Sequence, residues 1–245
     1  RLACIVEERL YQGLRFESQV MLLTPSNWKK TLTYAKPDIL LMESIWLSAT
    51  GHWHMGQCPA SPDRNELIEI VSQARRQSIP TVFWFTKGSA YHEHYQDFVR
   101  HFDFVFCADP DEADKLGREG VRTEILLPCV QTALYNPFRY YDRYDALNLK
   151  ILYDGWADLD RMTNDLDILK KLKPHGLSIV ESRYQIFKRR KNVLSDYKDV
   201  ILGCITPQER LTALRYAKAN VTFEKTLSLL TTQQWMSLEA AACRL

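Results

Sequence analysis

The chain has 245 residues, of which 46% are hydrophobic and 25% charged. This composition is typical of globular proteins and excludes a disordered, collagen-like or disulfide-scaffold chain. The 32 basic residues nearly balance the 30 acidic ones, so no net field attracts nucleic acid or anionic lipid. No apolar run approaches the ~20 residues that span a bilayer, and six scattered cysteines without a Cys-x-x-Cys pair indicate reduced thiols in a cytosolic protein.

Short apolar runs followed by helical patterns fill the first half of the chain. These runs are continuous rather than alternating, which is typical of strands covered on both faces in a parallel sheet. We therefore predict a doubly wound α/β domain at 1–140. Its predicted strands are 2–6, 19–23, 38–43, 80–85, 103–107 and 124–127, and its predicted helices are 65–78, 91–101 and 111–119.

The pattern changes at 136–149, an aromatic and charged stretch without a clean period, which we interpret as a linker. A second α/β unit follows at 150–245 and stops one or two elements short of a full sheet. Because the chain begins with Arg and ends inside a helical pattern, we expect it to be part of a longer polypeptide. The predicted strands of this unit are 150–153, 177–181, 199–202 and 219–223, and its helices are 160–173, 207–217 and 233–243.

In such sheets a ligand lies beyond the carboxyl ends of the strands, next to helix N-termini. Gly155 follows the first strand of the second unit and would let the backbone approach a ligand closely. Arg183 is either a phosphate clamp or a surface side chain. Thr231 and Thr232 would precede the last helix, where they could cap it or bind a phosphate. The basic run at 188–191 is a solvated edge, or contacts a membrane surface or an anionic glycan.

Four stretches, read in order, resemble one family: the GT-B glycosyltransferases, in the CgeB-like branch known as glycosyl transferases group 1. Each stretch is a weak motif, and their order carries the resemblance. They are Pro37–Ser44 with Trp46 and Gly51–Trp53; Ile79–Trp84 with His94–Phe98 and Phe102–Phe106; Leu127–Cys129 with Asn136–Pro137; and Tyr216–Val221 with Ser237–Cys243.

The resemblance implies two Rossmann-like domains that transfer a sugar from a nucleotide-diphospho-sugar, expected to be UDP-linked. The donor would lie on the C-terminal domain, with Gly155 facing its diphosphate, and the acceptor and catalytic base on the N-terminal one. No bound metal or other cofactor is expected. Glu239 matches the acidic residue that binds the donor ribose, and a carboxylate can accept hydrogen bonds from both ribose hydroxyls; a solvated helix residue is the alternative.

Four histidines and one carboxylate are candidates for the acceptor-side base. An imidazole titrates near neutral pH. His52 and His54 lie in a Gly-bounded loop after a strand, while Glu43 ends the strand 38–43; His92 and His94 are further candidates. The spacing His-x-His also suggests a metal, but no third ligand is evident. Aromatic side chains near these strand ends, which could stack on sugar rings, are Trp46, Trp53, Trp84 and Tyr91.

Departures from the family pattern keep a second interpretation open. Met236 stands where the family has Arg, Arg244 where it has Gly, and Lys87-Gly88 where it has an acidic pair. The alternative is a degenerate, non-catalytic GT-B module that serves as a binding or scaffold domain. A dinucleotide-binding dehydrogenase fits the sheet pattern, but no Gly-x-Gly-x-x-Gly follows a first strand.

The expected partners are a nucleotide-sugar and a glycan, lipid or protein acceptor, with no nucleic acid. The expected location is the cytoplasm, with peripheral contact at the inner face of the membrane.

Overall fold

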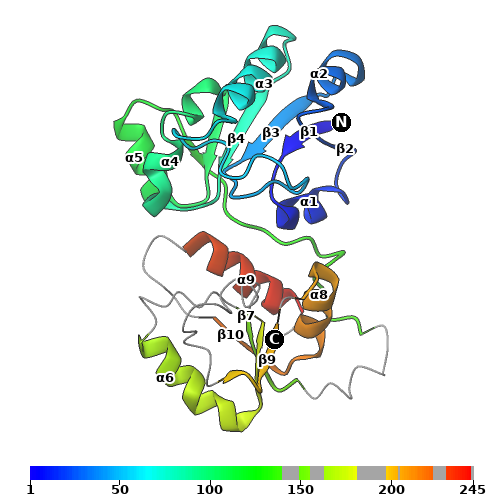
Figure 1. Cartoon of the computed structure of the whole chain (residues 1–245), viewed down its shortest axis with the longest axis vertical. Coiled ribbons are helices and arrows are strands. Elements are labelled where there is room, and N and C mark those ends of the chain that lie inside the picture. The colour runs from blue at the N-terminus through cyan, green and yellow to red at the C-terminus, as the bar shows by residue number, and fades with distance from the viewer. Residues whose placement is uncertain (140–148, 155–162, 181–196, 204, 223–229, 244–245) are drawn as a thin grey trace. The chain divides into compact units, whose positions relative to one another are not determined.

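The structure is a computed structural model that describes residues 1–139, 149–154, 163–180, 197–203, 205–222 and 230–243 (Figure 1). The chain forms two compact units. Unit 1 comprises Arg1–Gln131 and Lys225–Thr232, and unit 2 comprises Thr132–Glu224 and Gln233–Leu245. Each unit has its own parallel sheet.

The sheet of unit 1 has six strands in the order β2-β1-β3-β4-β5-β6, and every neighbouring pair is parallel. The predicted α/β class with a parallel sheet is therefore confirmed. The register places Glu43 of β3 beside Trp84 of β4. The strands are β1 (Leu2–Ile5), β2 (Val20–Leu22), β3 (Ile39–Glu43), β4 (Thr81–Phe85), β5 (Phe104–Cys107) and β6 (Glu124–Ile125).

Helices between these strands bury one face each. In α3 (Arg64–Arg76) the buried residues are Leu67, Ile70, Val71 and Ala74, spaced as one face of a helix. The other helices are α1 (Glu8–Leu14), α2 (Trp28–Lys30), which continues as a π-helix at Thr31–Ala35, α4 (His92–Tyr95) and α5 (Pro110–Arg118). Proline at the first position of α5 and the Asp109 side chain, which accepts from the backbone N–H of Asp111, define where that helix begins.

The helix predicted at 91–101 is wrong in its extent. Here the chain forms a 3₁₀ turn at Ser89–Tyr91, the short α4, and a second 3₁₀ turn at Val99–His101. Tyr95, Phe98, Val99 and Phe102 are all buried in the core, and the Phe83 ring of β4 lies 6.0 Å from the ring of Phe98 and 5.1 Å from that of Phe102. Packing of these rings therefore overrides the helical pattern of the local sequence.

Unit 2 contains a four-stranded parallel sheet in the order β10-β7-β8-β9. The helix α8 (Pro207–Tyr216) begins with a reciprocal cap, in which the Thr206 hydroxyl accepts from the Glu209 N–H and the Glu209 carboxylate accepts from the Thr206 N–H. The elements are β7 (Ile151–Asp154), α6 (Thr163–Leu172), a 3₁₀ turn (Lys173–His175), β8 (Leu177–Val180), β9 (Ile201–Gly203), α8 (Pro207–Tyr216), β10 (Ala219–Val221) and α9 (Leu230–Ala242).

The strand order of each sheet reverses at one point. In unit 1 the chain runs from β1 outward to β2 and then returns to the other side of β1 as β3; in unit 2, β10 lies on the opposite side of β7 from β8. Ligands of open α/β sheets bind beyond the carboxyl ends of the strands at such a reversal. The residues at these two positions are therefore the first to consider as functional.

Candidate functional site

Glu43 ends β3 at the reversal point of unit 1. Its side chain is buried, and its two carboxyl oxygens accept from the Glu7 backbone N–H at 2.9 Å and from the Thr86 hydroxyl at 2.8 Å. Burial raises the pKa of Glu43 to about 7, and the negative charge of Glu7 adds to this, against the opposing effects of Lys87 and of the hydrogen bonds. A carboxyl with this pKa can take up or release a proton near neutral pH.

Glu7 lies two residues after the end of β1 and links the segments that follow β1, β3 and β4. One oxygen of its carboxylate accepts from the Trp46 backbone N–H at 2.6 Å, and the other lies 2.7 Å from Nζ of Lys87, which follows β4. The Lys87 side chain is 9% exposed and that of Glu7 is 26% exposed. Glu7 therefore offers a carboxylate that solvent or a ligand can reach, beside a nearly buried ammonium group.

Sequence reasoning missed Glu7 and Lys87. The signal was present, because Glu7 follows the first strand as Glu43 ends the third, and Lys87 follows the fourth. In the sequence Lys87 stands out only as a departure from the family pattern, whereas the structure pairs it with the carboxylate of Glu7.

A frame of hydrogen bonds holds the loops that follow β3 and β4. The Gln57 side chain donates to the Glu43 carbonyl at 2.7 Å and accepts from the Ile45 N–H at 3.0 Å. The Thr86 N–H donates to the Ser44 hydroxyl at 2.8 Å. All five residues except Ile45 are polar, and all are buried, so their polar groups depend on one another for hydrogen bonding.

His52 and His54 lie in the loop after β3, as predicted from the sequence, and both are exposed. Nδ1 of His52 lies 2.9 Å from the Thr50 carbonyl oxygen. Within the described residues, neither imidazole hydrogen-bonds to Glu43 or Glu7, so the structure does not join the three predicted catalytic residues into one network. Their catalytic role remains a prediction.

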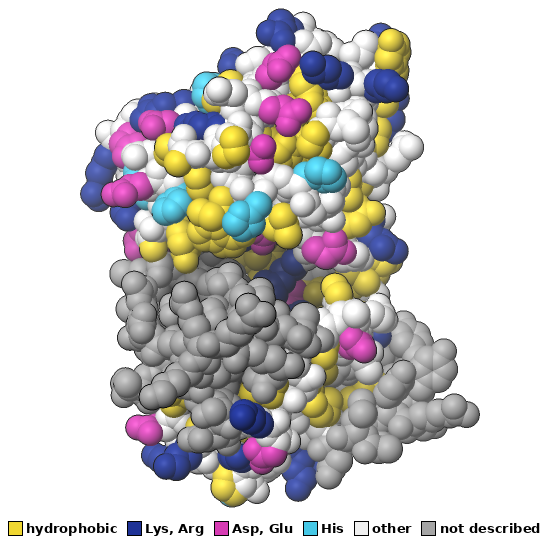
Figure 2. All heavy atoms as spheres, in the orientation of Figure 1, with side chains coloured by type: hydrophobic (Ala, Val, Ile, Leu, Met, Phe, Trp, Pro, Cys, Tyr) yellow, Lys and Arg dark blue, Asp and Glu magenta, His cyan; other side chains and the backbone are white. Residues whose placement is uncertain are grey.

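Three aromatic rings lie on the same two loops. Trp46 follows β3, and its ring lies 4.9 Å from that of Tyr91 and 6.2 Å from that of His94, in edge-to-face contact with both. Nδ1 of His94 is buried and has no hydrogen-bond partner among the described residues. All three side chains are partly exposed, and Figure 2 shows histidines beside hydrophobic side chains on the visible face of unit 1. Such a surface suits the ring of a sugar or a base.

In unit 2 a second charged cluster lies at the carboxyl end of β7. Arg210 of α8 forms ion pairs with Asp154, the last residue of β7, and with Glu239 of α9, whose carboxylate is 2.7 Å from the guanidinium. Burial alone would lower the pKa of Arg210, but the charges of Asp154 and Glu239 outweigh it and raise the pKa. Glu239 is only 1% exposed, so the solvated-helix interpretation of this residue is wrong.

The other predicted donor residues are placed less fully. Gly155, Arg183 and the basic run at 188–191 lie outside the described residues. Thr231 and Thr232 belong to the first turn of α9, which begins at Leu230, and do not precede the helix as predicted.

No group of three or more His, Cys, Asp or Glu side chains in the described ranges is arranged to hold a metal ion. Among the helices that the structure describes, none combines the length and apolar character that crossing a bilayer requires.

Fold and site together define an α/β protein with two parallel sheets, each carrying a charged cluster at its reversal point. No family model matches the chain, and no curated protein matches it. Three solved structures have a similar fold over 99% of this chain and 77–78% of their own. They are α-glucosyltransferase with UDP and a 13-mer DNA containing an HMU base (TM-score 0.63, 15% identity), the enzyme with UDP-glucose and DNA containing an abasic site (0.62, 14%), and the enzyme with UDP (0.60, 13%).

Proposed function

We propose that this chain is a glycosyltransferase of the GT-B type that transfers a sugar from a UDP-linked donor to a hydroxyl group of an acceptor. The observation that carries the proposal is the fold shared with α-glucosyltransferase over 99% of the chain, together with a charged cluster at the reversal point of each sheet. The CgeB-like branch remains a prediction from the sequence motifs.

The cluster in unit 2 suits the ribose of the donor better than its phosphates. The two carboxylates of Asp154 and Glu239 outnumber the one guanidinium of Arg210, so the cluster has a net negative formal charge. A negative charge repels a diphosphate. Carboxylate oxygens accept hydrogen bonds from a ribose diol. The diphosphate would then bind to Gly155, Arg183 and the first turn of α9, including Thr231 and Thr232, as the resemblance implies.

The cluster in unit 1 suits an acceptor hydroxyl. Glu7 and Glu8 place two carboxylates at the start of α1, so this helix N-terminus disfavours phosphate. The acceptor hydroxyl would donate to Glu7 and pass its proton to that carboxylate as its oxygen bonds to the anomeric carbon of the donor and the bond to the diphosphate breaks. Glu43 would take part through the proton that it holds near pH 7. Trp46 and Tyr91 would stack on the acceptor ring.

The acceptor class is part of the proposal. A glycan, lipid or protein was expected, and the small net charge argued against nucleic acid. Because two of the similar structures contain DNA, modified DNA with a free hydroxymethyl group belongs in the acceptor screen.

Calorimetric titration of the full chain with UDP and UDP-glucose tests the donor site, with GDP as the control nucleotide. We expect UDP and UDP-glucose to bind, and Glu239→Gln to weaken that binding about tenfold, which corresponds to ~1.4 kcal/mol. Gln234→Ala, an exposed position on the same helix, is the matched control and should bind normally. If the wild-type chain binds neither ligand, the non-catalytic module is the better interpretation.

Turnover is tested separately, by measuring UDP release with each acceptor class. Glu7→Gln should abolish release while leaving UDP-glucose affinity unchanged. Full turnover by this variant would exclude Glu7 as the base.

A further inference from the structure

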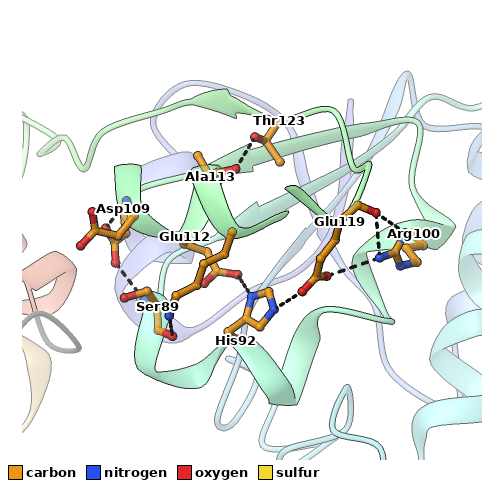
Figure 3. A network of polar contacts seen from close by, with 10 residues as sticks. Ser89, His92, Arg100, Asp109, Glu112, Ala113, Glu119 and Thr123 are labelled. Atoms are coloured by element: carbon orange, nitrogen blue, oxygen red, sulfur yellow. Dashed lines mark hydrogen bonds and ion pairs between the residues drawn. The ribbon is translucent and has the colours of Figure 1, made fainter. Parts of the chain in front are cut away.

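His92, the first residue of α4, lies between two carboxylates of unit 1 (Figure 3). Its Nδ1 is 2.9 Å from the Glu112 carboxylate and its Nε2 is 2.7 Å from that of Glu119. The His92 side chain is 13% exposed, and Glu112 is fully buried. A neutral imidazole has one N–H, whereas an imidazolium has two, so two carboxylate acceptors on opposite ring nitrogens favour the protonated ring.

Further contacts fasten the same stretch of chain to α5. The Ser89 N–H donates to the Asp109 carboxylate at 2.9 Å, and Nζ of Lys115 donates to the Ser89 carbonyl at 3.0 Å. On the far side, the Arg100 guanidinium donates to the Glu119 carbonyl at 3.3 Å, and lies 3.4 Å from its carboxylate. The loop from 88 to 95 is therefore held at its start by Ser89 and in its middle by His92 (Figure 3).

This loop carries two side chains of the candidate acceptor site and directly follows a third. Lys87, which pairs with Glu7, immediately precedes it, and Tyr91 and His94 flank His92. Its first residue, Gly88, has φ +80°, a conformation that glycine adopts readily. The backbone N–H of Tyr91 donates to the Gly88 carbonyl at 3.1 Å, and the contacts of Ser89 and His92 fix the loop further.

We propose that His92 is a positioning residue: by bridging Glu112 and Glu119 in its protonated form, it holds Tyr91 and His94 against the acceptor side of the site. The effect of His92 on catalysis rests on the proposed function. The bridge itself can be measured without any substrate.

The local electrostatics support a proton-dependent bridge. Burial by itself would lower the pKa of His92, but its hydrogen bonds to Glu112 and Glu119 and their negative charges outweigh this and raise it. Burial raises the pKa of Glu112 to about 7, against the opposing effect of His92. Deprotonation of His92 removes one of its two ring N–H donors, so the bridge weakens as pH rises through the raised pKa of this imidazole. Loss of the proton of Glu112 acts in the opposite direction, because a carboxylate accepts more strongly from an imidazolium than a neutral carboxyl does. The charged groups that contact the ring are Glu112 of α5 and Glu119, which directly follows α5. Lys115 of α5 and Asp109, which directly precedes α5, act on Glu112, and Arg100 of the 3₁₀ turn Val99–His101 lies beside Glu119.

Hydrogen exchange of the full chain tests the bridge, with protection factors of the 88–95 amides compared at pH 6 and pH 8.5. In the wild type we expect protection to fall about tenfold or more at the higher pH. In His92→Gln, protection of these amides should be low at both pH values. His92→Arg restores a cation whose N–H groups can donate to both carboxylates, and should regain part of the protection. Glu93→Gln, an exposed neighbour on α4, is the control and should match the wild type.

Glu119→Gln provides a second variant in case His92→Gln does not fold, because Glu119 is partly exposed and its loss leaves the ring in place. Equal protection of 88–95 in the wild type and in the folded variants would overturn the bridge.

Kinetics then test the consequence: His92→Gln should raise the acceptor KM about tenfold and leave the affinity for UDP-glucose unchanged. An unchanged acceptor KM with lost protection would overturn the positioning role. Lost protection in a chain that binds no UDP-sugar would support the bridge and overturn the proposed function instead.

Discussion

Replacing Glu43 by Gln should change how the stability of unit 1 depends on pH. The pKa of Glu43 rises from 4.5 to about 7 in the folded chain, chiefly through burial. A group whose pKa is raised on folding stabilises the fold when protonated, and that stability is lost as pH rises from its unfolded to its folded pKa. Each pKa unit corresponds to about 1.4 kcal/mol. The free energy of unfolding is therefore lower by about 3 kcal/mol at pH 8, where the buried carboxylate is charged, than at a pH where it is protonated.

Glutamine removes this titration while keeping the shape of the side chain. Its amide oxygen can accept from the Glu7 N–H, and its NH₂ group can donate to the Thr86 hydroxyl, in place of the contacts that the carboxyl makes. We therefore expect Glu43→Gln to be close to the wild type in stability at pH 5 and more stable than it by up to about 3 kcal/mol at pH 8.

Urea unfolding followed by tryptophan fluorescence at pH 5, 6, 7 and 8 measures this difference. Four of the six tryptophans belong to unit 1, so the signal reports mainly on that unit. Glu93→Gln, an exposed carboxylate of unit 1, is the control. If Glu43→Gln loses as much stability between pH 5 and pH 8 as the wild type, Glu43 does not titrate near 7 and the reasoning fails.

Two further substitutions test unit 2. Arg210→Ala leaves the carboxylates of Asp154 and Glu239 buried without their cation. It should lower the free energy of unfolding by about 3–5 kcal/mol, measured as a lower urea midpoint. A decrease below about 1 kcal/mol would show that the cluster is not a structural ion network. Thr206→Ala removes one half of the reciprocal cap with Glu209 at the start of α8 and should cost about 1 kcal/mol, seen as faster amide exchange in the first turn of α8; unchanged exchange there would contradict the capping role.

The fold followed from the sequence wherever local pattern and tertiary packing agree. In the described part of the chain, continuous apolar runs located the strands of both sheets, because apolar side chains predominate in strands that are covered on both faces. The helix predicted at 91–101 failed because Tyr95 and Phe98 pack into the core from separate short turns. The helix α1 went unpredicted: Leu10 is its only buried residue, so its apolar face is too narrow to give a helical period.

The candidate site followed only in part. Glu43 is predicted from its position at the end of a strand and Glu239 from the family resemblance, and the structure buries both. The partners Glu7 and Arg210 were missed because each meets its counterpart across a long stretch of chain: Glu7 pairs with Lys87, and Arg210 with Asp154. Gly155 and Arg183 lie outside the described residues.

By itself the sequence determined that strands and helices alternate, that the sheets are parallel, and that polar side chains stand at the ends of buried strands. Hydrophobic periodicity is a local property, so it can be read along the chain. Only the tertiary structure decided which polar residues meet, because strand order brings β1, β3 and β4 together and so joins Glu7, Glu43 and Lys87. Burial then changed their chemistry, since the pKa of Glu43 depends on neighbours that its own segment does not contain.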